Sequence, residues 1–372
     1  MKLPIFDVIH ESAMSADFPL TSDQEYALSN MQTCRTAERG GQILCCPDCG
    51  SAMIRYNPCN HRGCPICYRK NQIKWSIKRQ KKLLPVSHYH LVFSIPQVFV
   101  ITWLLYKRNT IEALFLCVGK AISELGEEYG LLQGSVLAFH SHGKGMCYKP
   151  HIHCVLTAGG MNENKKWVEI GSLKYTKIVE KIRETFYRIL AERILLEHLP
   201  DLRTINEREW SVHSTMHQNT GKWIIDYLSH SISGVVIQMD QDFLIDKEKR
   251  TVRFTEEHSG QKIETVLNYK TFTERYLNHI PPSREVMIRY YGLYANLHAN
   301  ELEQIRNELS VPDNEEDELD DKVQENSCPM CQGKMFAVIT FAPNEIPLFI
   351  RYAYVHGPPE HGEMIKKVKK CS

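Results

Sequence analysis

Two histidines one residue apart, His151 and His153, lie in the stretch YKPHIHCVLTAGG, which runs from position 148 to position 160. In a β-strand, residues i and i+2 face the same side of the sheet, so the two imidazoles would project together. Such a pair can bind one divalent cation and leave coordination positions open for a substrate. The alternative is that both are ordinary polar residues on a half-buried strand. The choice between the two decides whether the chain is an enzyme.

A third histidine can be placed beside this pair. Residues 134–143 are predicted to form a strand, followed by a turn through two glycines and then by the strand at 151–160. If the hairpin is centred near residue 145 or 146, His140 lies opposite His151, and His142 shares the same face. We therefore take His140 as the first choice for a third metal ligand. The alternative is that His140 and His142 are polar positions on an exposed face.

Cysteines form the second group of residues that could do chemistry. The chain has 13, and seven of them lie between Cys34 and Cys67. Two Cys-x-x-Cys pairs, Cys46 with Cys49 and Cys64 with Cys67, are separated by fourteen residues. Each pair places two thiolates on one side of a tight turn, so we predict that together they complete one tetrahedral structural zinc site. Without zinc this block has little core, and its folding should need the metal.

Further cysteines are candidates for other zinc sites. Cys34, Cys45, Cys59 and His61 could hold a second ion, although cysteine is also a common small core residue. Cys328 and Cys331 form another half-site in the C-terminal part of the chain. Three residues are candidates to complete it: His356, His361 and Cys371.

The charge distribution points to a nucleic-acid partner. The net charge is only +1, but residues 69–82 contain seven Lys or Arg and no acid, whereas seven of the nine residues 313–321 are acidic. A basic helix that carries a tryptophan suits contact with DNA, and the alternative is a solvated helix surface. The predicted DNA-binding residues are Arg69, Lys70, Lys74, Trp75, Lys78 and Arg79.

Length and patterning indicate an α/β protein of two or three domains. Predicted strands and helices alternate: strands at 88–96, 134–143 and 151–160, helices at 98–125, 174–197 and 221–232. This order favours an antiparallel sheet flanked by helices. We expect a zinc-binding and DNA-binding domain at 1–85, an α/β domain at 86–240, and a C-terminal region with an acidic linker at 241–372.

Membrane insertion and secretion are not expected. No run of about 18 apolar residues occurs, and the N-terminus lacks a basic start followed by an apolar stretch. The expected location is the cytoplasm. The sequence leaves the oligomeric state open.

Eight stretches of the chain resemble, in the same order, the motifs of one known family. They are CRTAERGGQILCCPDCG, YNPCNHRGCPICYRKNQIKW, LLPVSHYHLVFSIP, FHSHGKGMCYKPHIHCVLTAGGM, DYLSHSIS, FTERYLNHIPP, IRYYGLYAN and CPMCQGKM. The chain resembles transposases of the insertion-sequence ninety-one family, within the HUH superfamily of single-strand nucleases, which is named for a His-hydrophobic-His motif. The resemblance covers most of the chain between Cys34 and Ile339.

The resemblance implies a mechanism and a substrate. His151 and His153 match the family's metal-binding motif, and Tyr227 in DYLSHS matches its first nucleophilic tyrosine. The implied reaction is attack of Tyr227 on single-stranded DNA at the element ends and at the target, assisted by Mg²⁺ or Mn²⁺. It leaves a 5′-phosphotyrosine and a free 3′-OH, as in rolling-circle transposition. Lys222 and His230 are candidates to assist the tyrosine.

The chain also departs from the family pattern. Ser231 stands where many members have a second tyrosine, and Gln42 and Gly63 stand where histidines are common in the zinc module. Two alternative functions remain: a plasmid replication initiator or relaxase with the same chemistry, and a zinc-dependent DNA-binding protein without catalysis. The implied location is the bacterial cytoplasm, with the nucleoid when the protein is bound to DNA.

Overall fold

The fold is taken from a computed structural model of the 372-residue chain. The structure describes residues 5–15, 19–173, 176–201, 210–217, 225, 228–229, 236–237, 243–258, 261–311, 327–345 and 364–365. The chain divides into two compact units built from separate segments. The first unit comprises Met1–Lys70, Gln238–Glu274 and Glu316–Ser372, and the second unit comprises Asn71–Ile237 and Arg275–Glu315. The three consecutive domains expected from the sequence stay a prediction.

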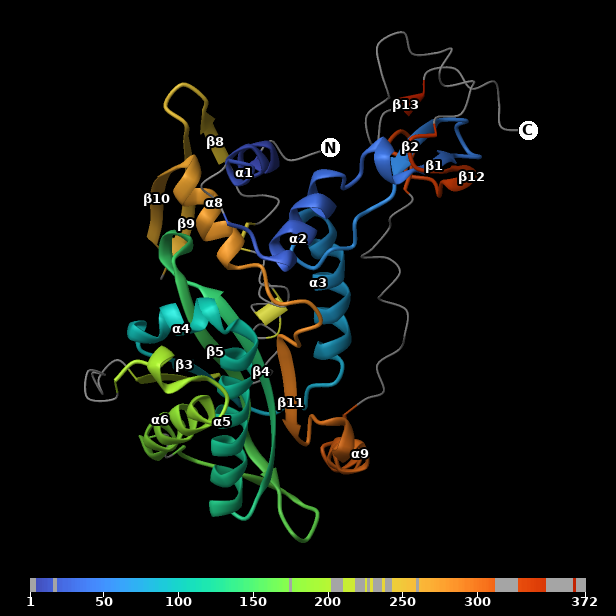
Figure 1. The fold of residues 1–372 in the computed structure, drawn as a ribbon. Coiled ribbons are helices and arrows are strands. Elements are labelled where there is room, and N and C mark those ends of the chain that lie inside the picture. Colours follow the sequence, from blue (N-terminus) through green and yellow to red (C-terminus); the bar gives the residue numbers. More distant parts are fainter. Residues whose placement is uncertain are drawn as a thin grey trace. The chain divides into compact units, whose positions relative to one another are not determined.

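The second unit is built on a sheet with the strand order β11-β4-β5-β3-β7, and β6 pairs with β5 at one end. Figure 1 labels β11, β4, β5 and β3 of this sheet. All these pairings are antiparallel, which confirms the predicted fold class. The strands are β3 (His88–Ser94), β4 (Leu132–His142), β5 (Tyr148–Met161), β6 (Trp167–Glu169), β7 (Ser211–His217) and β11 (Ile288–Gly292).

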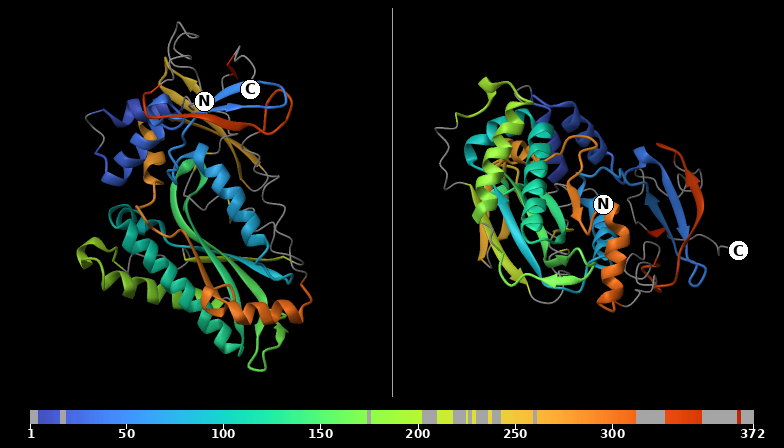
Figure 2. Two further views of the ribbon diagram at one scale, coloured as in Figure 1. Left: turned by 90° about the vertical axis from the view of Figure 1, so that its right-hand side faces the viewer. Right: turned by 90° about the horizontal axis from the view of Figure 1, so that it is seen from below.

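Helices α5 and α6 lie side by side along this sheet (Figures 1 and 2). The predicted helix at 98–125 is interrupted at Tyr106, whose backbone leaves the helical region (φ −125°, ψ 44°), so that it forms two helices. Apolar residues recur every three or four positions in α5 and give it one buried stripe. The helices are α4 (Val100–Leu105), α5 (Lys107–Glu128), α6 (Thr176–Ala191) and α9 (Ala299–Glu308), with short 3₁₀ helices η2 (Gln97–Phe99), η3 (Lys144–Met146), η4 (Leu196–His198) and η7 (Asn296–His298).

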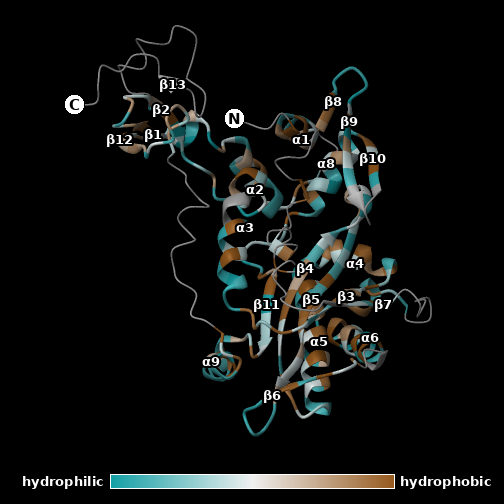
Figure 3. Cartoon of the chain, turned by 180° about the vertical axis from the view of Figure 1, so that it is seen from behind, coloured by the Kyte–Doolittle hydropathy of each residue, from teal (hydrophilic) through white to brown (hydrophobic). Residues whose placement is uncertain are grey.

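Alternation along the central strands separates two faces of the sheet. On one face Leu91, Leu137, Phe139 and Ile152 pack into the core beneath α5 and α6, where Trp103 stacks on Phe139 with 5.6 Å between ring centroids. On the other face lie the alternate residues of the same strands. Figure 3 shows hydrophobic residues along β4, β5 and α5, whereas α9 is largely hydrophilic. Along each central strand, successive side chains thus belong alternately to one face and to the other.

The opposite face has a core of its own. Val136, Ala138 and Val155 pack there against two residues of a helical segment, Ile225 and Leu228. Ile225 and Leu228 are fully buried. With Ser229 they are the described members of the helix predicted at 221–232; its other residues lie outside the described residues. This segment therefore lies on the face opposite α5 and α6.

The first unit contains two small sheets, with orders β12-β1-β2-β13 and β10-β9-β8. In the first of these, β1 pairs with a strand from the far end of the chain, so that Gly41 lies opposite Phe341. Helix α3 begins in this unit and ends in the second; α8 does the same. The elements are α1 (Ile5–Ala13), α2 (Ser22–Gln32), η1 (Ala37–Arg39), β1 (Gly41–Cys45), β2 (Ala52–Tyr56), α3 (Pro65–Gln80), β8 (Phe243–Asp246), β9 (Thr251–His258), β10 (Gln261–Asn268), α8 (Tyr269–Asn278), β12 (Phe336–Phe341) and β13 (Met364–Ile365).

Among the described residues, no helix combines the length and the apolar character that crossing a membrane requires.

Two glycines of the second unit allow a test of the pairing of β11 with β4 at the edge of the sheet. Gly292, at the end of β11, and Gly130, after α5, both have a positive φ, +55° and +65°. A Cβ at Gly292 would lie 1.7 Å from the carbonyl oxygen of Gln133, whereas one at Gly130 would meet nothing within 4 Å. Gly130→Ala should cost about 1 kcal/mol of unfolding free energy. Gly292→Ala should cost about 2 kcal/mol more because the backbone must shift. Urea unfolding measures both, and equal losses would contradict the described β4–β11 pairing.

Candidate active site and zinc sites

The β4–β5 hairpin brings three imidazoles together. His140 pairs with His151 and Ala138 pairs with His153, which confirms the register predicted from the sequence. One ring nitrogen from each of His140, His151 and His153 lies within 4.8 Å of the others. His142 lies beyond a shift in register, with its ring centroid 5.9 Å from that of His140, and is not one of the three converging groups.

Hydrogen bonds fix the orientation of the His151 ring. Its Nδ1 lies 2.7 Å from the carbonyl oxygen of Lys149. Because a carbonyl only accepts, Nδ1 carries the proton and donates it, and in the neutral ring Nε2 keeps its lone pair. That Nε2 lies 3.0 Å from Nε2 of His153. The backbone therefore orients one lone pair toward the space that the three rings share.

A fourth histidine, His90 on β3, supports His153. The Nε2 of His90 lies 2.8 Å from Nδ1 of His153, and the two rings are nearly parallel, with 5.0 Å between centroids. The register of β3 on β5 places Val92 opposite His153, so His90 lies diagonally across on the same face. Sequence analysis missed this residue. The signal was the stretch HYH at 88–90, but only the pairing of β3 with β5 shows which histidine it faces.

The three clustered histidines, of which His140 and His153 are buried and His151 is half-buried, are neutral at physiological pH. Burial lowers the pKa of His151 to about 4 and holds the pKa values of His140 and His153 well below their usual range, with neighbouring imidazoles acting in the same direction. Neutral imidazole is the form that binds a metal. Three neutral nitrogens fixed on a hairpin fit a divalent cation whose remaining positions are filled by oxygen ligands.

Ile225 and Leu228 lie on the sheet face that carries the three histidines. Val136, Ala138 and Val155 share the face of His140 and His153 by strand parity, and Ile225 and Leu228 pack on them. The hydroxyl of Ser229 accepts a hydrogen bond from the Nε2 of Gln72, at 3.1 Å. Four residues singled out from the sequence lie outside the described residues, namely Lys222, Tyr227, His230 and Ser231.

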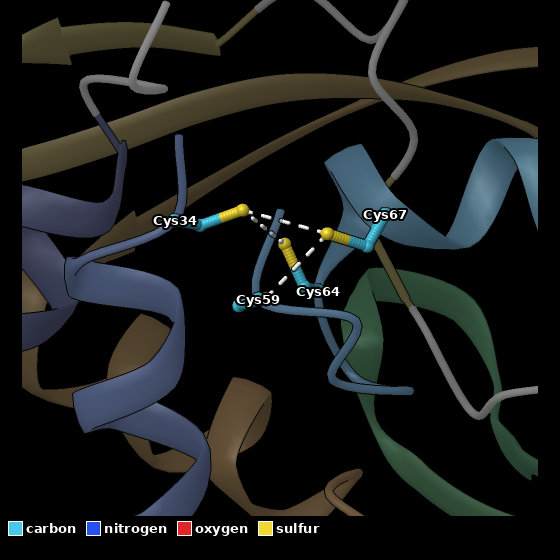
Figure 4. A group of neighbouring side chains, drawn as sticks. All are labelled: Cys34, Cys59, Cys64 and Cys67. Carbon is cyan, nitrogen blue, oxygen red and sulfur yellow. Dashed lines mark hydrogen bonds between the residues drawn. The ribbon is translucent and has the colours of Figure 1, made fainter. Parts of the chain in front are cut away.

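Four cysteines form one group in the first unit (Figure 4). Cys34 follows α2, Cys59 follows β2, and Cys64 and Cys67 lie at the start of α3. The Sγ atom of Cys34 lies 3.4 Å from that of Cys67 and 3.7 Å from that of Cys64, and Cys59 lies 3.5 Å from Cys67. All four are free thiols whose sulfur atoms converge, which is the arrangement of a structural zinc site.

A second group of four joins distant parts of the sequence. Cys46 and Cys49 lie in the turn between β1 and β2, and their sulfur atoms lie 3.5 Å from those of Cys331 and Cys328, respectively. In both turns the backbone closes on the first cysteine, through Gly50 N–H to Cys46 and Gln332 N–H to Cys328. Two such turns facing each other give four thiolates for one zinc ion.

The predicted pairing of the two N-terminal Cys-x-x-Cys motifs is therefore wrong. Cys46 and Cys49 lie at the β1–β2 turn, whereas Cys64 and Cys67 come after β2 has ended, so the hairpin separates the two pairs. Each pair completes its site with other cysteines.

The other predicted zinc ligands have different surroundings. His61 is not in either group, and its Nδ1 accepts a hydrogen bond from the N–H of Gly63 at 3.1 Å. Cys45 is buried in the core of the β1 sheet. Three candidate partners of Cys328 and Cys331 lie outside the described residues, namely His356, His361 and Cys371.

The predicted DNA-binding helix is α3, and its residues differ in exposure. Lys74 and Lys78 are exposed, and nothing is described of the side chains of Arg69 and Lys70. Trp75 is partly buried and donates from Nε1 to the hydroxyl of Tyr290 at 3.1 Å, and Arg79 lies over the Tyr290 ring. DNA contact by these six residues stays a prediction.

Known transposases and transposase domains are similar to this chain. Residues 5–95 match a family model described as a transposase zinc-binding domain, and residues 134–301 match one described as a putative transposase. The chain is 26% identical over 381 residues to the putative transposase y4qJ of Sinorhizobium fredii, covering 91% of this chain and 94% of that protein. It is 24% identical over 294 residues to the transposase for insertion sequence element IS801 of Pseudomonas savastanoi, covering 72% and 70%. No solved structure matches the chain.

The zinc-binding module followed by the transposase module defines the protein as a transposase, an enzyme that processes DNA. The chain belongs to the insertion-sequence ninety-one family of transposases.

The number of bound zinc ions tests the two cysteine groups. Purified protein should contain two zinc ions per chain, and Cys328→Ser should reduce this to one because it removes a ligand from the second group. Cys147→Ser, at an exposed cysteine outside both groups, is the matched control and should retain two. Elemental analysis measures the ratio. An unchanged zinc content in Cys328→Ser would contradict the assignment of Cys328 to the second group.

Proposed function

We propose that this transposase nicks and rejoins single-stranded DNA through attack by Tyr227, as an HUH nuclease of the single-tyrosine kind. One observation supports this most strongly: the sheet face that gathers His140, His151 and His153 is also the face on which Ile225 and Leu228 pack. These two residues flank Tyr227 in the sequence. In the sequence, Tyr227 directly precedes Leu228, whose buried side chain packs on the face that carries the imidazoles.

The three histidines are proposed to hold one Mg²⁺ or Mn²⁺ ion. When bound, this ion would polarise the scissile phosphate and neutralise its developing charge. The protein's own contribution is to fix the lone pairs. The Lys149 carbonyl holds His151, and His90 accepts the Nδ1 proton of His153, so that both Nε2 atoms present lone pairs to one point.

The covalent step transfers a phosphodiester linkage to the protein. The phenolic oxygen of Tyr227 forms a bond to phosphorus, and the bond from phosphorus to the 3′ oxygen breaks. The phenol loses its proton and the departing 3′ oxygen gains one. Because the 5′-phosphotyrosine keeps an ester linkage, attack by a 3′-OH reverses the step and joins strands without an energy source. With Ser231 in the second position, one chain holds one DNA end at a time.

The partner is proposed to be single-stranded DNA at the element ends and at the target, in a rolling-circle type of transposition. The exposed lysines of α3 supply positive charge for the DNA backbone. The zinc groups hold the segment that precedes α3. A replication initiator or relaxase would share the covalent chemistry, and transfer of a marked element to a new target distinguishes transposition from either.

Loss of the tyrosine tests the covalent step. Incubation with single-stranded oligonucleotides and Mn²⁺ should give an adduct that resists SDS, and Tyr227→Phe should abolish it because phenylalanine has no nucleophilic oxygen. DNA binding should stay within about 2-fold, since one hydroxyl contributes little to backbone affinity. Tyr26→Phe, at an exposed tyrosine, is the control and should react normally. An adduct formed by Tyr227→Phe would place the nucleophile elsewhere.

Loss of the imidazoles tests the metal site in the same assay. His151→Ala and His153→Ala should each reduce adduct formation by at least about 100-fold, since each removes a ligand of the cation. His213→Ala, at an exposed histidine on β7 of the same sheet, should leave the rate unchanged. Normal activity in either ligand variant would defeat the assignment.

Loss of His90 tests the support of His153. In Tyr227→Phe protein, His90→Ala should weaken Mn²⁺ binding by about 10- to 100-fold, because the Nδ1 proton of His153 loses its acceptor. His90→Gln, whose amide oxygen can accept that proton, should recover most of the affinity. Isothermal titration calorimetry measures both. Equal binding by His90→Ala and the parent would show that His90 only fills space.

A further inference from the structure

A pocket in the second unit opens beside the sheet face that carries the three histidines. About 430 Å³ of space free of protein atoms lies within and in front of it, part of which is open solvent, and Val136 and Ile225 form part of its wall. Aromatic side chains from the stretch IRYYGLYAN, Tyr290 and Tyr294, line it together with Leu302 of α9. The wall is mainly apolar, as in pockets that bind flat organic rings. The proposed covalent reaction makes no use of this pocket.

The aromatic walls are held in place by hydrogen bonds. The hydroxyl of Tyr290 accepts from Nε1 of Trp75 at 3.1 Å. The hydroxyl of Tyr294 lies 2.8 Å from Nε2 of His88 and accepts from the N–H of Leu84 at 3.2 Å. Both rings are therefore fixed before a ligand arrives, which reduces the ordering cost of binding.

Positive charge lies at the edge of the pocket. Arg79 and the exposed Lys82 both line it, and none of its described lining residues is Asp or Glu. The guanidinium of Arg79 lies 4.0 Å from the centroid of the Tyr290 ring. Its Nε is buried and has no hydrogen-bond partner among the described residues. An anionic oxygen at this edge would supply that acceptor, and an amide from Asn296 is available for a polar ring edge.

We propose that this pocket receives one unstacked base of the single-stranded DNA substrate, with the adjoining phosphate at Arg79 and Lys82. The inference rests on the proposed function, because that function supplies the single strand. Val136 and His140 lie on one strand four residues apart, so the pocket wall is about 13 Å from the imidazoles. The captured base therefore belongs to a nucleotide near the cleaved bond and not to the cleaved one. A base so held positions the scissile phosphate.

The test combines a protein variant whose pocket is filled with oligonucleotides that lack one base. Full-length Tyr227→Phe protein is titrated with single-stranded oligonucleotides tiled across the DNA on both sides of the gene, and anisotropy gives the affinity. The tightest binder is then remade with an abasic site at each position in turn. Leu302→Trp fills the pocket, and Leu297→Trp, at a residue 86% exposed on η7, is the matched control.

Leu302→Trp should weaken binding of intact DNA by about 5- to 100-fold, the range that one stacked base contributes. One abasic position should cause a similar loss in the parent and no further loss in Leu302→Trp, since the two changes remove the same contact. Asn296→Ala should also weaken binding of intact DNA, with a smaller further loss at that same abasic position than the parent shows. This second variant keeps the test valid if Leu302→Trp does not fold. Binding by Leu302→Trp or Asn296→Ala equal to that of Leu297→Trp would overturn the pocket. Absence of any covalent adduct in the wild type would instead overturn the proposed function.

Discussion

Two-residue alternation in the β4–β5 hairpin determines both the core and the site of the second unit. Odd and even positions face opposite sides, so Phe139 and Ile152 enter the core under the helices while His140 and His151 meet on the other side. A slip of one residue in either strand would move its imidazoles into the core and its apolar residues out. The free energy gained by burying this core therefore also fixes the register that brings the three histidines together.

The cysteine groups solve a different problem, that of holding distant segments in a small unit. The β1 sheet alone has a modest core, and it is completed by a strand from the other end of the chain. Four thiolates bound to one zinc ion release far more free energy than a short sheet can. Because Cys46 and Cys49 share their group with Cys328 and Cys331, zinc binding also supports the pairing of β1 with β12.

Local patterns predicted the parts of the site that depend on short-range geometry. The hairpin register followed from strand period and turn position, and it placed His140 opposite His151 correctly. The sequence contains three His-x-His stretches, at 88–90, 140–142 and 151–153. Only the pairing of β3 with β5 shows that His90 supports His153 while His88 bonds to Tyr294. The predicted pairing of the two N-terminal Cys-x-x-Cys motifs was wrong for the same reason. Spacing along the chain identifies two cysteines that bind one zinc ion together, but it does not show which distant cysteines complete the site.

His140, His151 and His153 are proposed to bind one cation together. Pulsed electron paramagnetic resonance of Mn²⁺ added to the zinc-loaded protein counts the coordinated imidazole nitrogens directly. We expect couplings to three imidazoles, falling to two in His140→Ala. A spectrum of fully hydrated Mn²⁺, or one that His140→Ala leaves unchanged, would contradict it.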